Sequence, residues 1–122
     1  MGNKTDIFII DDDTQNLHYY QAIINKGEGL RCIGSTTNSE NAIAIVVTTL
    51  PDIVLIDYAL YPKSGFEIAT ELKNQLPDLP VVLLGGRATL QEQAEAIGAL
   101  YIPMPITPRK LIDTIHDVMS NT

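Results

Sequence analysis

The chain has 122 residues, of which 45% are hydrophobic and 19% are charged, a composition typical of one folded domain. Its formal net charge is −7, and its eight Lys and Arg residues are scattered, which argues against a direct nucleic-acid surface. No apolar run approaches the ~20 residues of a membrane span. The single cysteine, Cys32, excludes an internal disulfide and favours a reducing compartment. We therefore expect one cytoplasmic domain without a membrane segment.

Strand-like and helix-like patterns alternate along the whole chain. Short runs of β-branched and aliphatic residues predict strands, and longer runs with apolar residues three and four apart predict helices. In chain order, with helix caps included, we expect a strand at 6–10, a helix at 14–26, a strand at 30–35, a helix at 39–50, a strand at 53–56, a helix at 64–76, a strand at 81–84, a helix at 89–97, a strand at 99–102 and a helix at 107–119. The predicted N-caps are Ser39 for the helix at 39–50, Ser64 for the helix at 64–76 and Thr107 for the helix at 107–119. Such alternation predicts an α/β domain with a five-stranded, doubly wound parallel sheet and helices on both faces.

Acidic residues follow two of the predicted strands. Asp11, Asp12 and Asp13 come directly after the first strand, and Asp57 ends the third. In a doubly wound sheet of order 2-1-3-4-5 these two strands are neighbours, so their acids converge where such sheets bind ligands. A divalent cation such as Mg²⁺ would relieve the repulsion between these carboxylates. It would also leave one oxygen of Asp57 free to attack the phosphorus of a phosphoryl group, as covalent phosphoryl transfer to Asp requires. Asp13 is expected instead to cap the helix that begins at Thr14.

Three stretches of the sequence resemble the receiver domains of two-component response regulators. They are Ile9-Ile10-Asp11-Asp12-Asp13, Pro51-Asp52-Ile53-Val54-Leu55-Ile56-Asp57, and Gly65-Phe66-Glu67. The resemblance covers essentially the entire chain, so it implies one receiver domain over residues 1–122 with a flavodoxin-like, CheY-like fold. It leaves open whether an output domain follows Thr122 and whether the domain forms a homodimer.

The resemblance also implies roles for particular residues. Asp57 would be the phosphoacceptor, phosphorylated by a histidine kinase or a phosphotransfer protein. Asp11, Asp12 and Asp57, with the backbone carbonyl of Ala59, would hold Mg²⁺ or Mn²⁺. The fourth helix, fifth strand and fifth helix would form the face that contacts a downstream effector or output domain. Such a domain is a signalling module rather than an enzyme.

The chain departs from the family pattern at two strand ends. The family normally has a Ser or Thr at the end of the fourth strand, where this chain has Gly85. It has Lys-Pro at the end of the fifth strand, where this chain has Met104-Pro105, and a thioether cannot form an ion pair. Tyr101 matches the aromatic switch position, although the hydroxyl with which it is normally coupled is missing. We therefore expect an impaired switch and, without a cation at 104, raised carboxylate pKa values.

Several alternatives and smaller expectations accompany this interpretation. The chain is also consistent with a pseudo-receiver that binds its partner without phosphorylation. A remoter alternative is a haloacid-dehalogenase-like phosphatase, because Asp11-Asp12-Asp13-Thr14 superficially resembles an Asp-x-Asp motif, although no convincing later Lys or second acidic pair follows. Arg87 is either a phosphoryl contact or a solvated loop cation. The Met104–Pro105 peptide is expected to be cis.

Overall fold

The structure, a computed structural model, describes residues 4–121, so residues 1–3 and 122 of the expected 1–122 domain lie outside the described residues. Within this range strands and helices alternate as the sequence predicts, with one additional short 3₁₀ helix before α4. The elements are β1 Thr5–Ile10, α1 Thr14–Lys26, β2 Leu30–Thr36, α2 Ala42–Thr49, β3 Ile53–Asp57, α3 Gly65–Gln75, β4 Val81–Gly85, η1 Ala88–Leu90, α4 Gln91–Ala96, β5 Leu100–Pro103 and α5 Pro108–Ser120. None of the helices in this range is long and apolar enough to cross a bilayer.

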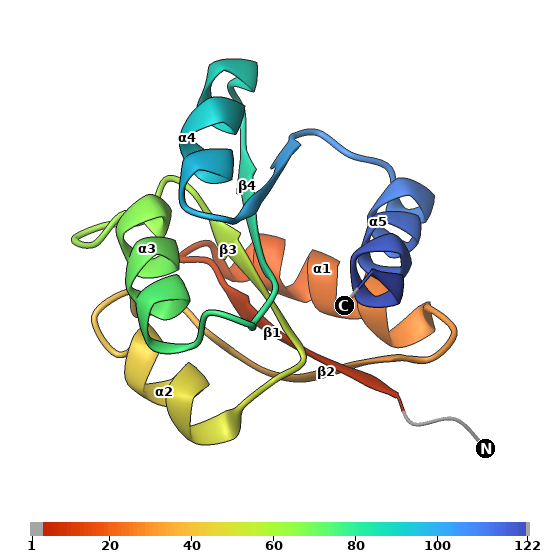
Figure 1. Cartoon of the computed structure of the whole chain (residues 1–122). Helices are drawn as coiled ribbons and strands as arrows, with labels where there is room; N and C mark the ends of the chain where they lie inside the picture. The colour runs from red at the N-terminus through yellow and green to blue at the C-terminus, as the bar shows by residue number, and fades with distance from the viewer. Residues whose placement is uncertain (1–3, 122) are drawn as a thin grey trace.

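The strands form one parallel sheet in the order β2-β1-β3-β4-β5, which confirms the predicted doubly wound topology (Figure 1). Strands β1 and β3 are direct neighbours, and their last apolar residues, Ile10 and Ile56, are register partners. The residues that follow these two strands therefore stand side by side at the carboxyl edge of the sheet.

The sheet has a separate hydrophobic core on each face. In β1, Ile7 and Ile9 belong to the core formed with α1 and α5, whereas Phe8 and Ile10 belong to the core formed with α2, α3 and α4. Figure 1 shows the same division, with α1 and α5 on one side of the sheet and α2, α3 and α4 on the other. Burial on both faces explains why the strands are continuous apolar runs instead of alternating ones.

Side chains cap three of the helices at the positions that the sequence predicts. The Asp13 carboxylate caps α1 by accepting hydrogen bonds from the backbone N–H groups of Gln15 (2.8 Å) and Asn16 (3.3 Å). Ser64 caps α3 and Thr107 caps α5, with Pro108 as the first residue of α5. Each cap satisfies an N–H group that the helix itself leaves without an acceptor.

The prediction that Ser39 caps the second helix is wrong. Helix α2 begins at Ala42 with Asn41 as its cap residue, because the Asn38 side chain holds the preceding turn by accepting from the N–H groups of residues 40 and 41. Ser39 is buried instead, and its hydroxyl accepts a hydrogen bond from the backbone N–H of Lys63. The buried stripe of α2 is also narrower than expected, since Leu50 lies beyond the helix in a left-handed conformation and is exposed.

Candidate functional site

Three carboxylates converge at the carboxyl edge of β1 and β3. Asp11, Asp12 and Asp57 each place one carboxylate oxygen within 4.8 Å of the others. Asp11 is 2% exposed and accepts a hydrogen bond from the backbone N–H of Asp13 (2.9 Å), whereas Asp12 is exposed and Asp57 is partly buried. The predicted acids are therefore brought together, in a cluster that is closed toward the sheet and open toward solvent.

The electrostatics of the cluster favour a cation. Burial is the main reason that the pKa of Asp11 rises from 3.8 to about 6, and the charge of Asp57 adds to the rise. Burial also raises the pKa of Asp57, while a hydrogen bond from the backbone of Ala59 opposes that rise. The pKa values of Asp11 and Asp57 are thus raised in the expected direction, but burial is the main cause and repulsion between the acids is a smaller one. Hard carboxylate oxygens gathered in this way are suited to Mg²⁺ or Mn²⁺.

Close packing against α3 fixes the backbone at Asp57. The first residue of α3, Gly65, donates its N–H to the carbonyl of Tyr58 (2.9 Å), and Tyr58 donates to Leu84 in β4 (2.8 Å). A Cβ atom at Gly65 would overlap the carbonyl oxygen of Asp57 and would lie 2.8 Å from the Cα of Tyr58. Only glycine allows this close approach. Gly65 is part of the sequence motif that carries the family resemblance, but the motif does not predict this contact.

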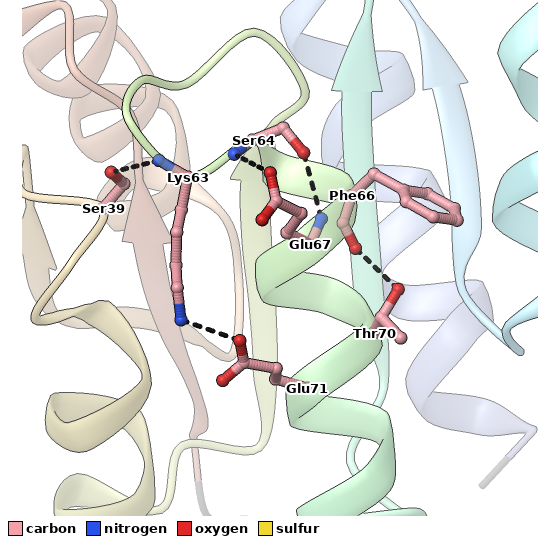
Figure 2. Close-up of polar contacts among 7 residues, drawn as sticks. All are labelled: Ser39, Lys63, Ser64, Phe66, Glu67, Thr70 and Glu71. Carbon is pink, nitrogen blue, oxygen red and sulfur yellow. Dashed lines mark hydrogen bonds and ion pairs between the residues drawn. The ribbon is translucent and has the colours of Figure 1, made fainter.

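The loop between β3 and α3 is anchored at its distal end (Figure 2). Lys63 donates its backbone N–H to Ser39 (3.2 Å) and its ammonium contacts Glu71 (2.7 Å). Ser64 and Glu67 form a capping box, in which each side chain accepts the other's backbone N–H. Figure 2 shows these contacts along the first two turns of α3, so the loop after Asp57 is fixed to α3 and to the segment before α2 that carries Ser39.

An open depression of about 830 Å³ lies beside Asp57. Its lining includes Ala59, the residue expected to offer a carbonyl, together with Gly85 and Arg87 from the end of β4. The Arg87 side chain is exposed at this position. The depression therefore joins the phosphoacceptor candidate to the strand end where the sequence departs from the family pattern.

Tyr101 occupies the space beside Gly85. Its ring is buried, with 5% exposed, and a Cβ atom at Gly85 would lie 2.5 Å from the Tyr101 hydroxyl oxygen. That oxygen accepts a hydrogen bond from the backbone N–H of Arg87 (3.1 Å). The ring is thus packed inward, in contact with a position that carries no side chain.

The end of β5 is joined to the end of β4 and to α1. Met104 donates its N–H to the carbonyl of Gly85 (2.7 Å), and the Met104–Pro105 peptide is cis, as predicted. A second cis peptide, Tyr61–Pro62, was not predicted. The Met104 sulfur accepts a weak hydrogen bond from the hydroxyl of Tyr20 (3.9 Å). Burial and the charges of nearby acids raise the pKa of Tyr20 to about 12.

Sequence reasoning did not identify Tyr20 as a site residue. Its helical spacing with Leu17 and Ile24 marks one buried face, and all three residues are buried in α1. That spacing indicates where the ring lies but does not show which group its hydroxyl contacts. The adjacent Tyr19 is 50% exposed, in agreement with the pattern.

Comparisons with known proteins agree with one another. A family model described as the response regulator receiver domain matches residues 7–116. The phosphate regulon transcriptional regulatory protein PhoB of Pseudomonas aeruginosa is 30% identical, in a match that covers 100% of this chain and 54% of that protein. The chain spans about half or less of the length of the curated relatives it matches.

Two solved structures show the same fold. The signal receiver domain of NarL from Mycobacterium tuberculosis has a TM-score of 0.91 with 17% identity, over 99% of this chain and 100% of that one. A CheX–CheY–BeF₃–Mg²⁺ complex from Borrelia burgdorferi contains a chain with a TM-score of 0.89 and 20% identity, over 97% of this chain and 91% of that one.

Proposed function

The chain belongs to the response regulator receiver family of two-component signal transduction, and from this premise we propose that it accepts a phosphoryl group on Asp57. The donor would be a histidine kinase or a phosphotransfer protein in the cytoplasm. The observation that carries the proposal is the convergence of Asp11, Asp12 and Asp57 at one sheet edge. The family match favours this function over a haloacid-dehalogenase-like phosphatase.

The proposed reaction is a transfer to a carboxylate. An Asp57 oxygen forms a bond to phosphorus while the bond between phosphorus and the donor's nitrogen breaks, and the electron pair leaves with the donor. Mg²⁺ or Mn²⁺, held by Asp11, Asp12, Asp57 and the Ala59 carbonyl, would offset the repulsion between carboxylates and phosphoryl oxygens. Gly65 keeps the Asp57 backbone in place, because it allows α3 to approach the carbonyl of Asp57 closely.

We further propose that the response of this domain to phosphorylation is weak. Gly85 offers no hydroxyl to a phosphoryl group, and Met104 offers no cation. Tyr101 is buried beside Gly85, and its hydroxyl oxygen accepts a hydrogen bond from the backbone N–H of Arg87. The surface of α4, β5 and α5, with which we expect an effector or output domain to interact, would then change little on phosphorylation.

The test is phosphorylation with a small phosphodonor. The protein is incubated with acetyl phosphate and Mg²⁺, and intact mass spectrometry follows the addition of one phosphoryl group. We expect labelling of the wild type, loss of labelling with excess EDTA, and no labelling of Asp57→Asn. Unlabelled wild type, or an Asp57→Asn variant labelled to the same extent, would contradict the proposal.

The inward Tyr101 supports a second function, a module that binds its partner constitutively. In that case the α4–β5–α5 surface is competent without a phosphoryl group. Wild type and Asp57→Asn should then bind the partner with the same affinity. A large loss of partner binding in Asp57→Asn would rule out this second function and favour the first.

A further inference from the structure

The hydroxyl of Tyr20 is a buried donor without a strong acceptor. Tyr20 projects from α1 into the core shared with α5, and only 5% of it is exposed. The acceptor its hydroxyl contacts is the Met104 sulfur at 3.9 Å, and a thioether accepts hydrogen bonds only weakly. Buried hydroxyl groups normally have a full partner, because a lost hydrogen bond is not replaced by water. The contact therefore leaves most of the donor capacity of Tyr20 available to an oxygen ligand.

The surroundings of this hydroxyl connect it to the acid cluster. The charges of Asp11 and Asp57 act on Tyr20, and with burial they raise its pKa to about 12, so the phenol keeps its proton at neutral pH. Met104, which the Tyr20 hydroxyl contacts, donates its backbone N–H to the carbonyl of Gly85, and Gly85 lines the depression beside Asp57. The phenol is thus a neutral donor that contacts the residue directly after β5, and the charges of two carboxylates of the cluster influence it.

A phosphoryl group on Asp57 would bring new anionic oxygens to this part of the molecule. Among the described residues that line the depression, Arg87 is the only one with a positively charged side chain, and that side chain is exposed. Hydrogen bonds to charged oxygens are about twice as strong as those between neutral groups. An oxygen of this kind would be a much better acceptor for Tyr20 than the sulfur it contacts now.

We propose that the Tyr20 hydroxyl donates a hydrogen bond to an oxygen of the phosphoryl group carried by Asp57, in place of a cation at position 104. This inference rests on the proposed function. During transfer, Tyr20 keeps its proton and supplies only the hydrogen bond, while the new bond forms between Asp57 and phosphorus. Its hydroxyl exchanges the Met104 sulfur for a phosphoryl oxygen, and its ring remains in the core.

The experiment compares Tyr20→Phe with Tyr19→Phe, a matched control at a neighbouring exposed tyrosine. Each variant removes one oxygen atom and keeps the ring. Titration with beryllofluoride in the presence of Mg²⁺, followed by NMR, measures affinity for a phosphoryl mimic on Asp57. We expect Tyr20→Phe to bind the mimic about 10-fold more weakly, the loss expected when one hydrogen bond to a charged group is removed. Its Mg²⁺ affinity and its thermal midpoint should match those of the wild type.

A second substitution separates a phosphoryl contact from a structural role. Met104→Lys places an ammonium at the end of β5, and it should restore mimic binding in the Tyr20→Phe background. A Tyr20→Phe variant that binds beryllofluoride as the wild type does, or that loses Mg²⁺ affinity equally, overturns this inference and leaves the proposed function standing. A wild type that binds no beryllofluoride overturns the proposed function and this inference with it.

Discussion

The two halves of one sheet edge differ sharply in chemistry. The ends of β1 and β3 carry three carboxylates whose oxygens lie within 4.8 Å of one another. The ends of β4 and β5 carry Gly85 and Met104, with the Tyr101 ring buried beside the glycine. The first half concentrates charge that a cation and a phosphoryl group would engage, whereas the second has no side chain at position 85 to move. We therefore expect that accepting a phosphoryl group and reporting it are separable properties of this chain.

The largest expected effect concerns the backbone behind the acids. Gly65→Ala should lower the free energy of unfolding by about 3 kcal/mol or more, because the new Cβ would overlap the Asp57 carbonyl and force the backbone apart. In an unconstrained helix the same change would stabilise, since alanine is the better helix former. Urea unfolding measures the difference. Gly86→Ala is the control from the other half, where a Cβ meets nothing within 4 Å, and it should have little effect.

The next prediction concerns the charge of the acidic half in metal-free protein. Folding raises the pKa of Asp11 from 3.8 to about 6, so ionised Asp11 destabilises the folded chain above pH 6, and this penalty vanishes as pH falls toward 4. Asp11→Asn should therefore raise the free energy of unfolding at pH 7 by about 1–3 kcal/mol in EDTA. The gain should shrink between pH 6 and pH 4, as thermal unfolding across that range would show. Asp12→Asn, at an exposed position, should give a smaller gain, and a pH-independent gain for Asp11→Asn would refute the explanation.

The sequence was sufficient to predict the element order, the sheet topology and the acid cluster, because these depend on local patterns. Apolar runs define buried strands, and the acids that follow neighbouring strands must meet. It failed where a side chain has two possible partners. Ser39 looked like a helix cap, yet its hydroxyl binds the backbone of Lys63, far along the chain. The Tyr20 hydroxyl and the Gly65 contact were likewise missed, because both depend on packing between distant elements.

The third prediction concerns a substitution at the ends of β4 and β5 that restores the residue type the family normally has there. Gly85→Thr should displace the Tyr101 ring, since a Cβ at this position lies 2.5 Å from the ring's hydroxyl oxygen. The cost should be modest, about 1–2 kcal/mol, because an aromatic ring can rotate outward. Chemical nitration or NMR of Tyr101 would detect the new exposure, and beryllofluoride with Mg²⁺ should then produce larger shifts in α4, β5 and α5 than in the wild type.

The control for this substitution is Gly86→Thr, at a neighbouring position with open space around it. It should leave Tyr101 buried and the shifts unchanged. If Tyr101 stays buried in Gly85→Thr, the ring does not depend on the missing side chain, and the contrast between the two halves would lose its structural cause.

The smallest expected change in the free energy of unfolding concerns the N-caps of the helices that follow β3 and β5. Ser64 caps α3 after the acidic half, and Thr107 caps α5 after the end of β5; their hydroxyls each accept an N–H at 3.1 Å. Replacing either by alanine should cost about 1 kcal/mol, because each change leaves one helical N–H without its partner. Capping is local backbone chemistry, so the two costs should be equal although the two halves differ in function. A Ser64→Ala variant that also weakens beryllofluoride binding, with Thr107→Ala unaffected, would show that the loop after Asp57 transmits the state of α3 to the acids.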